Sequence, residues 1–427
     1  MKVIVQPNGS QLAECLIRPS IDTDQLEGII GKVFDEVGEN GDRALMSYAE
    51  QFDKVTLKSL AVSDDDIKKA EQQLSEELKS AIKTAYSNIK KFHESQVIED
   101  LKVVTVDGVE CWQKASAIES VGLYIPGGTA PLFSTVLMLG IPASIAGCEN
   151  VILCSPPQKN GEIHSATIYA ADLCGIKKIF RAGGSQAIAA MTLGTESIPK
   201  VYKLFGPGNQ YVTAAKQKAQ KYGVAIDLPA GPSEVLVYAD DSAVPSFVAA
   251  DLLSQAEHGV DSQVVLVSSS EDIALQSIEA VKTQTLSLPR KEVVMKCLEN
   301  SVALVIQDVD EAFDFINDYA PEHFIIASEN SESYIPKIKN AGSVFLGNYS
   351  PESAGDYASG TNHTLPTSGY AKSYSGTHLD AFVKKITFQK LTKKGIQNLG
   401  NTIMTMAREE QLEAHARAVE IRLKELQ

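Results

Sequence analysis

The 427-residue chain has no long apolar run, no paired cysteine motif and no excess of basic residues. No apolar stretch approaches the roughly 20 residues that a membrane-spanning helix needs, and the N-terminus, MKVIVQPNGSQLAE, lacks the apolar core of a secretory signal. The six cysteines are scattered, with no CxxC pair, which predicts reduced, mostly buried thiols. We therefore expect a soluble protein with a cytoplasmic location and no membrane partner.

The charge balance is acidic, with 39 basic against 54 acidic residues and a net charge of −15. Such a surface repels nucleic acid and anionic lipid, and no local basic run reverses it. The chain is also too long for one ordinary hydrophobic core, so two or more domains are expected. These features favour an enzyme acting on a small molecule, with no nucleic-acid partner.

Residues 1–115 read as a mainly helical N-terminal region. Ser63 and Asp66 are placed to form a capping box. The apolar residues that follow recur at spacings of three and four as far as Phe92, which predicts one long amphipathic helix with a buried face. His93 lies beside this apolar stripe, and we expect it to be solvated.

From about residue 116, short β-branched runs alternate with helical stretches. The expected strands are VGLYI (121–125), NVILCS (150–155), KKIFRA (177–182) and VYKLFG (201–206), and the expected helices lie around 131–147, 161–174, 185–193 and 209–222. This alternation predicts an α/β domain over 116–233, with a parallel sheet covered on both faces.

A second block, 234–375, resembles a diverged repeat of the first. Offset by 114 positions, the matched pairs are Tyr124 with Tyr238, Pro131 with Pro245, Phe133 with Phe247 and Leu139 with Leu253. After a gap of one residue, NVILCS falls on QVVLVS (263–268), and the expected strands SVALVI (301–306), HFIIAS (323–328) and SVFLGN (343–348) follow. Coincidence among apolar residues is the alternative, but the shared order favours an internal duplication.

Residues 376–427 are expected to form a C-terminal helical tail. Its last helix carries an apolar stripe of Leu412, His415, Val419, Leu423 and Leu426. Core packing is the usual role of a histidine in such a stripe. A terminal helix of this kind often packs on a neighbouring subunit, and the sequence alone leaves both readings open.

Four glycine-rich turns follow predicted strands, at 124–131, 181–187, 205–211 and 229–234. Glycine there lets a backbone approach a ligand, and the helix N-termini beyond favour anions. Neither GxGxxG nor GxxxxGK[ST] is present. Tight strand-to-helix turns are the alternative, but four of them at one edge of a parallel sheet predict a ligand-binding cleft.

Several residues have the chemistry of metal ligands. Gln255 and His258 are three apart at the end of a predicted helix, where they would share a face and where Gly259 would cap the helix. A simple role for His258 in the field of the helix C-terminus is the alternative. Asp356 lies in a Gly/Ser/Thr-rich loop (350–367) that also holds His363. Together, Gln255, His258, Asp356 and His415 offer nitrogen and oxygen ligands suited to zinc.

The adjacent pair Glu322–His323 lies between a predicted helix and the strand HFIIAS. A carboxylate beside an imidazole offers two proton acceptors of different strength, and histidine titrates near neutral pH. The alternative is a surface glutamate beside a half-buried histidine. We predict that the chemistry of the protein centres on this pair.

The combination of these segments resembles a known family. GLYIPGGTAPLFSTVLM, FGPGNQYVTAAK, DLPAGPSEVLV, DLLSQAEHG, APEHF, AGDYASGTNHTLPT and LEAH occur in the family's order, from about residue 25 to His415. They are similar to the signature blocks of the histidinol dehydrogenase family. That resemblance implies a homodimer with shared active sites, built from two related, incomplete Rossmann-like domains of the aldehyde-dehydrogenase-like class.

The resemblance also implies the reaction and the role of each residue. The reaction would be a zinc-containing, NAD-dependent oxidation of L-histidinol through L-histidinaldehyde to L-histidine, with one zinc per subunit. Glu322 would activate water and His323 would act as the acid–base. Gln255, His258 and Asp356 of one subunit and His415 of the other would bind zinc. These four residues, together with His323, Ser233, His363 and Glu410, would bind the substrate. The NAD would be contacted by Tyr124, Gln186 and Asn209.

Two other functions remain open at this stage. One is a zinc-dependent hydrolase in which Glu322 activates water and no hydride moves, and the other is a non-catalytic module that binds an amino acid. The presence of Glu322, His323 and the complete ligand set argues against the second.

Overall fold

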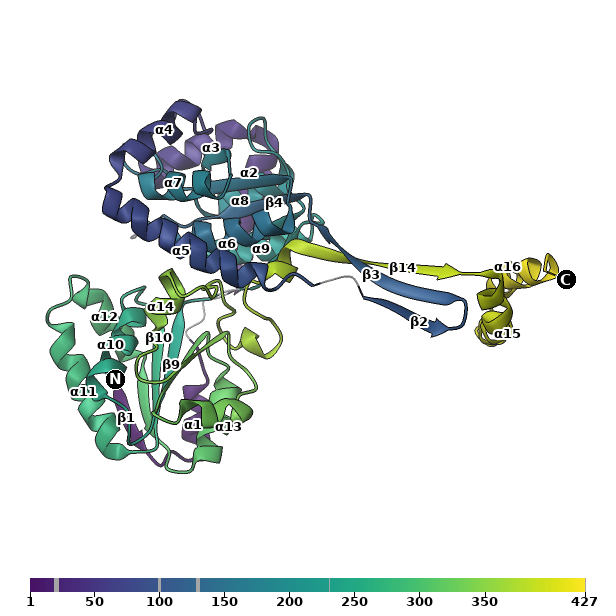
Figure 1. The fold of residues 1–427 in the computed structure, drawn as a ribbon. Coiled ribbons are helices and arrows are strands. Elements are labelled where there is room, and N and C mark those ends of the chain that lie inside the picture. Colours follow the sequence, from purple (N-terminus) through teal and green to yellow (C-terminus); the bar gives the residue numbers. More distant parts are fainter. Residues whose placement is uncertain (19–22, 99–100, 128–130, 230, 427) are drawn as a thin grey trace.

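The computed structural model describes residues 1–18, 23–98, 101–127, 131–229 and 231–426. The predicted glycine turns 124–131 and 229–234 therefore lie partly outside the described residues. Two bodies, each built on a parallel sheet, sit side by side, and a long arm extends away from them (Figure 1). The α/β prediction with two parallel-sheet units is confirmed.

The first sheet holds five parallel strands in the order β6-β5-β4-β7-β8. Its strands are β4 (Ser120–Tyr124), β5 (Asn150–Ser155), β6 (Lys178–Arg181), β7 (Lys203–Phe205) and β8 (Ala225–Ile226). Successive side chains of a strand point to opposite faces, so each face has its own core. Those of Tyr124 and Ile152 join one core, and those of Leu123 and Leu153 join the other.

Helices cover both faces of this sheet, which explains why its strands are apolar throughout. The first face carries α2 (Thr23–Asn40), α3 (Asp42–Tyr48), the π-turn Ala49–Asp53, α8 (Gly184–Leu193) and α9 (Gln210–Gln220). The second face carries α4 (Asp64–Gln73), α5 (Glu76–Glu94), α6 (Ser134–Ala146) and α7 (Ser165–Leu173). The strands and helices expected between residues 121 and 222 are thereby confirmed.

The second sheet repeats the strand order of the first. Its six parallel strands run β1-β11-β10-β9-β12-β13, which is the first order with β1 added at one edge. They are β1 (Lys2–Val5), β9 (Glu234–Ala239), β10 (Gln263–Ser268), β11 (Val302–Val305), β12 (His323–Ala327) and β13 (Ser343–Leu346). Strands β4 and β9 start 114 positions apart, at Ser120 and Glu234, so the topology agrees with the predicted duplication.

Helices also cover both faces of the second sheet. One face carries α10 (Pro245–Ala256), α11 (Glu271–Thr285) and α12 (Lys291–Glu299), and the other carries α1 (Gly9–Cys15) and α13 (Val309–Tyr319). The short helix α14 (Glu352–Tyr357) follows β13, and 3-10 turns lie at Ser331–Lys337, Tyr370–Lys372 and Leu379–Phe382. Among the described residues, no helix is long and apolar enough to cross a membrane.

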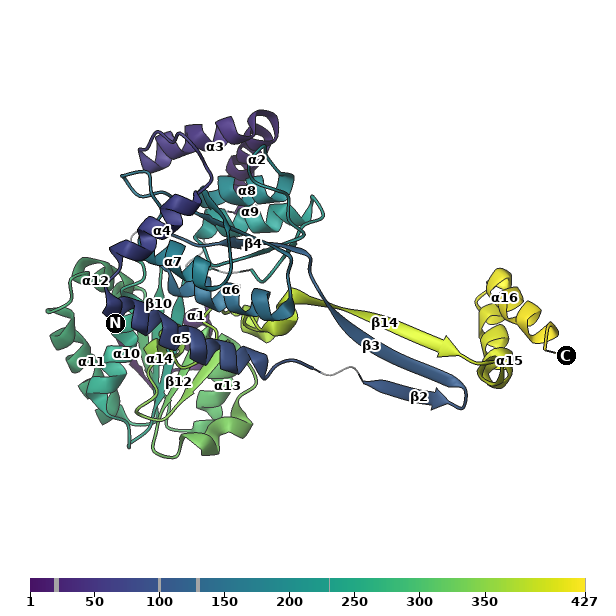
Figure 2. The same ribbon diagram turned by 45° about the horizontal axis from the view of Figure 1, so that its top comes forward.

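The arm is an antiparallel three-stranded ribbon in the order β14-β3-β2. Its strands are β2 (Lys102–Val106), β3 (Val109–Ala117) and β14 (Val383–Leu391), and α15 (Lys393–Glu409) and α16 (Glu413–Lys424) lie at its far end. Figures 1 and 2 both show these helices well away from the two bodies. The segment 376–427, expected to be helical, therefore also contains a strand.

Three local predictions are wrong. The single long helix after Ser63 is two helices, because Leu74 is extended and the Ser75 hydroxyl caps α5 by accepting from Leu78 N. His93 is fully buried rather than solvated, with Nδ1 2.9 Å from Ile89 O and Nε2 3.3 Å from Asn362 Nδ2. Helix α10 ends at Ala256 with Glu257 as its cap, so Gly259 does not cap it.

Candidate active site

A cavity of about 1050 Å³ lies between the two bodies. From the first sheet it is lined by the turns after β4, β6 and β7, which all stand at the carboxyl edge of that sheet. From the second sheet it is lined by residues that precede strands, namely Ser233 before β9, Ser262 before β10 and Glu322 before β12. The cleft predicted at strand carboxyl ends is thus completed by the amino edge of the second sheet.

Glu322 and His323 stand at the start of the central strand β12 and are buried, 6% and 4% exposed. The Glu322 Oε2 atom accepts a hydrogen bond from Glu234 N at 2.9 Å and lies 3.7 Å from His323 Nδ1. Burial raises the pKa of Glu322 to about 8, against an ordinary value of 4.5. When ionised, this carboxylate is a stronger base than a solvated one.

Three carboxylates surround the His323 imidazole. Its Nε2 lies 3.3 Å from Asp356 Oδ1, and its Nδ1 lies 4.0 Å from Glu352 Oε1 in addition to the Glu322 contact. Burial lowers the pKa of His323, but the charges of Glu352, Glu322 and Asp356 outweigh it and raise the pKa well above its ordinary range. The imidazole is therefore a stronger base here than in water.

A possible metal site adjoins this pair. Among the described residues, one ligand atom each of His258, Glu352 and Asp356 lie within 4.8 Å of one another. Glu352 and Asp356 are four apart on α14, which places both on one face of the helix. Glu352 Oε2 is buried without a hydrogen-bond partner, and the buried Asp356 Oδ1 has only the His323 contact at 3.3 Å. Buried acceptors of this kind fit a divalent cation with nitrogen and oxygen ligands.

Gln255 lies at the same place. With its amide turned to satisfy both neighbours, the nitrogen donates to Glu352 Oε1 and the oxygen accepts from Glu234 N at 2.8 Å. The structure thus brings together Gln255, His258 and Asp356 of the predicted ligand set, and adds Glu352, which the sequence analysis missed. The signal for Glu352 was its spacing of four from Asp356 inside the loop 350–367.

His415 and Glu410 do not join this cavity within one chain. Glu410 follows α15 and His415 lies in α16, at the far end of the arm, and both are exposed. Core packing of His415 is therefore wrong for this chain. Their predicted roles in the site of a second subunit stay predictions.

Two predicted substrate-binding residues, Ser233 and His363, line the cavity. The His363 Nδ1–H donates to Asp356 O at 2.8 Å, and Nε2 lies 3.0 Å from Thr135 Oγ1 and accepts from its hydroxyl. Burial lowers the pKa of His363, which favours this neutral form. His363 therefore joins α6 of the first body to the loop that carries Asp356.

The three predicted NAD-contacting residues also line the cavity, all from the first body. The Tyr124 hydroxyl accepts from Gly184 N at 3.0 Å, Gln186 lies in the first turn of α8, and the Asn209 side chain caps α9 by accepting from Val212 N at 3.2 Å. They surround helix N-termini, which suit a phosphate-bearing ligand.

A buried ion pair shapes the turn after β7. Lys216 Nζ donates to Gly206 O at 2.9 Å, and Asp227 Oδ2 accepts from Gly206 N at 2.8 Å, while the two side chains pair with each other. Gly206 has φ of +129°, and a Cβ there would stand 2.1 Å from Tyr124 O. Only glycine fits, so the turn is held against the strand that carries Tyr124.

Asp251 of α10 gives a prediction on stability. Burial raises its pKa to about 7 from 3.8, so the folded state binds a proton that the unfolded state releases. The stabilisation is complete below pH 4 and is lost as the pH rises through 7. The full shift corresponds to about 4 kcal/mol, and for a half-buried side chain we expect about 2 kcal/mol. Asp251→Asn should thus be the more stable protein at pH 8, by urea unfolding, and close to the native protein near pH 4.

The control for this prediction is Asp241→Asn, because Asp241 is exposed in the same body. An equal gain at pH 8 in both variants would show that general charge reduction, rather than burial of Asp251, is responsible.

The fold and the cavity define the class of protein. Glu322, beside His323, and His258, of the candidate cation site, line one cavity of small-molecule size between two duplicated parallel-sheet units, and helix N-termini of the first unit also line it. This is an α/β enzyme in which one body offers a ligand-binding edge and the other offers proton-transfer groups.

Comparison with known proteins identifies the family. The sequence pattern of the family described as histidinol dehydrogenase matches residues 16–423. The histidinol dehydrogenase of Bacteroides thetaiotaomicron is 57% identical over 426 residues, covering 100% of both chains, and that of Escherichia coli K12 is 50% identical over 419 residues, covering 97% of this chain and 96% of the other. The crystal structure of histidinol dehydrogenase from Elizabethkingia anophelis superposes with a TM-score of 0.97 at 56% identity, over 100% of this chain and 98% of that one. The chain belongs to the histidinol dehydrogenase family, as its motifs predicted.

Proposed function

We propose that the chain catalyses the NAD-dependent four-electron oxidation of L-histidinol through L-histidinaldehyde to L-histidine, the last step of histidine biosynthesis, with zinc in its site. The observation that carries the proposal is the buried Glu322–His323 pair beside Gln255, His258 and Asp356, with Glu322 and His258 lining the cavity. Family membership supplies the substrate class, and the cavity supplies groups with the required chemistry.

The first oxidation needs a base for the hydroxyl proton. His323 would accept this proton as the carbinol carbon gives up a hydride, for which bound NAD would be the acceptor, and the aldehyde would form. The carboxylates around His323 strengthen it as a base. The proton then leaves His323 for solvent before the second step.

The second oxidation needs water, because only the aldehyde hydrate can release another hydride. Glu322 would remove a proton from water as its oxygen adds to the aldehyde carbon, and would pass that proton to the former carbonyl oxygen, which completes the hydrate. His323 then accepts a hydroxyl proton of the hydrate as the second hydride leaves, which gives the acid. Two NAD are reduced for each histidine formed. Tyr124, Gln186 and Asn209, at the opposite wall, would contact the NAD.

Gln255, His258 and Asp356 would hold zinc, completed by His415 of the partner subunit. The buried Glu352 Oε2, which accepts no hydrogen bond, and the buried Asp356 Oδ1 beside His323 fit such an ion. Bound zinc would supply a positive centre that orients the imidazole and amino nitrogens of the substrate. The same ligands, with His323, Ser233, His363 and the partner subunit's Glu410, would hold the substrate's polar groups.

The arm supports the proposal of a homodimer with shared sites. Its strands and helices expose apolar side chains, including Val104, Phe388 and Ile421. Exposed apolar surface of this kind marks an interaction site. A second copy would cover it and bring the end of one arm to the other copy's cavity, which gives exposed His415 and Glu410 a function.

The test is metal analysis paired with an assay of histidinol and NAD. Purified protein should contain about one zinc per subunit and form two NADH per histidine. Removal of the metal with a chelator should abolish turnover, and added zinc should restore it. The alternative, a zinc-dependent hydrolase using Glu322-activated water, predicts turnover without NADH. Metal-replete protein that formed no NADH from histidinol would refute the proposed reaction.

A further inference from the structure

Glu234, the first residue of β9, touches three functional side chains through its main chain alone. Its N–H donates to Glu322 Oε2 at 2.9 Å and lies 2.8 Å from the Gln255 amide oxygen. Its carbonyl oxygen accepts from His323 Nδ1 at 3.4 Å. The position of this one peptide therefore fixes Glu322, His323 and the predicted zinc ligand Gln255 relative to one another.

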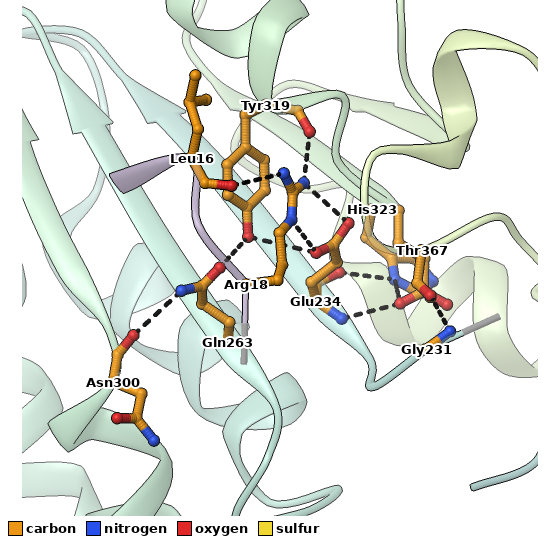
Figure 3. A network of polar contacts seen from close by, with 10 residues as sticks. Leu16, Arg18, Gly231, Glu234, Gln263, Asn300, Tyr319, His323 and Thr367 are labelled. Carbon is orange, nitrogen blue, oxygen red and sulfur yellow. Dashed lines mark hydrogen bonds and ion pairs between the residues drawn. The ribbon is translucent and has the colours of Figure 1, made fainter. Parts of the chain in front are cut away.

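The side chain of Glu234 lies in a buried polar network (Figure 3), and Glu234 does not line the cavity. Its carboxylate accepts from Arg18 at both oxygens, from Nε at 3.0 Å and from Nη2 at 3.3 Å, and from the Tyr319 hydroxyl at 3.4 Å. The Glu234 and Arg18 side chains are 2% and 14% exposed. A forked pair of this kind fixes the orientation of both partners.

Arg18 also holds the segment that leads into Glu322. Its guanidinium lies 3.7 Å from the centre of the Tyr319 ring, and Nη2 donates to Tyr319 O. Tyr319 ends α13, and Ala320 in the left-handed region and Pro321 then connect it to Glu322. Arg18 thus contacts both chain segments that lead to the Glu322–His323 pair, at the start of β9 and at the end of α13.

Arg18 comes from a distant part of the sequence, 216 residues before Glu234. It follows α1, whose neighbour Leu16 packs on the second body, and it precedes α2, which packs on α8 and α9 of the first. Helix α1 thus packs on the second body, and α2, which begins at Thr23, packs on the first. None of the motifs of the cavity contains it.

We propose that Arg18 and Glu234 form a positioning pair for the reaction, which holds the Glu234 peptide, and through it Glu322 and His323, in the geometry of proton transfer. The inference rests on the proposed function, since it assigns the pair to those two bases. Neither residue lines the cavity. A shift of about 1 Å in a catalytic group can cost about 100-fold in rate. The pair would therefore act by holding Glu322 and His323 at the distance that proton transfer needs.

The test compares three variants of the full-length, metal-replete protein. Arg18→Met removes the anchor and should lower kcat about 100-fold with the KM for histidinol changed less than about threefold. Arg18→Lys keeps the positive charge but loses the planar, forked donor geometry, and its kcat should be at least about tenfold higher than that of Arg18→Met. Glu234→Gln keeps an acceptor for Arg18, and should show an intermediate loss.

Asp66→Asn is the control. Asp66, in α4, pairs with the buried Arg181 at 2.8 Å, and Asp66 neither lines the cavity nor belongs to a cavity turn. This variant should lose stability in thermal unfolding and keep its kcat. A loss of kcat in Arg18→Met no larger than in Asp66→Asn, or no recovery in Arg18→Lys, would overturn the positioning role.

A structural readout separates this inference from the proposed reaction. In a crystal structure of Arg18→Lys or Glu234→Gln, the contact between Glu234 N and Glu322 Oε2 should lengthen beyond 3.5 Å or be lost in part of the molecules. Unchanged contacts in both would refute the positioning role, whatever the activity. Failure of the native protein to form NADH from histidinol would instead refute the reaction, and the crystal structures would still decide the role of Arg18.

Discussion

Glu322→Gln is expected to slow the oxidation of histidinaldehyde by about 10²- to 10⁴-fold, the usual contribution of a general base. Oxidation of histidinol to the aldehyde should fall by less than about tenfold, because that step needs His323 and no water. The amide oxygen of glutamine can still accept the hydrogen bond from Glu234 N, so the fold around the site should persist. Stopped-flow measurement of NADH from each substrate separates the two steps.

The pH dependence gives a second readout of the same variant. Burial raises the pKa of Glu322 to about 8, so the group is mostly protonated below that pH and becomes a base above it. The native rate of aldehyde oxidation should rise with pH through about 8, and this rise should be absent in Glu322→Gln. Glu329→Gln, at an exposed position beyond the same strand, is the control. An equal loss in both half-reactions would remove the water-activating role.

The second large effect is recovery of activity from two inactive subunits. His258→Asn and His415→Asn should each lower activity at least about 100-fold, with loss of zinc and weaker substrate binding. Co-expression of the two, with different affinity tags, should restore about a quarter of the native activity. Half of the dimers are then mixed, and each mixed dimer has one site with both histidines intact.

Co-expression of His258→Asn with Asp356→Asn is the control. Both residues lie in the same subunit's cavity, so no combination of these chains yields a site with both intact. Recovery in the His415 mixture and none in the control would establish a site built by two subunits. No recovery in either, or full zinc retention in His415→Asn, would show that His415 does not complete the site.

Much of the fold could be predicted because its signals are local. Apolar strands such as NVILCS and QVVLVS, separated by helical periods, report burial on both faces, and both are strands over their full length. The offset of 114 residues predicted a repeated unit, and the two sheets share one strand order. The break at Leu74 was missed because an apolar residue continues the helical period whether its backbone is helical or extended.

The site was predictable only in part. Gln255, His258, Asp356, Glu322 and His323 belong to contiguous blocks of sequence, and the structure brings all five together. Glu352 was missed because it has the same local setting as an exposed acid in a polar loop. Its burial arises only when α14 packs against α10. His93 was assigned to solvent for the same reason, since the loop with Asn362 covers it.

The sequence by itself determined the α/β class, the family and the Glu322–His323 pair, because these depend on residue type and spacing along the chain. Only the tertiary structure decided how the pair is held. It placed the pair at the amino edge of the second sheet, and brought Arg18 to Glu234 and Glu352 to His323. The physical reason is that burial and charge pairing depend on which surfaces pack together. Residues 216 positions apart share no local pattern that reports such a contact.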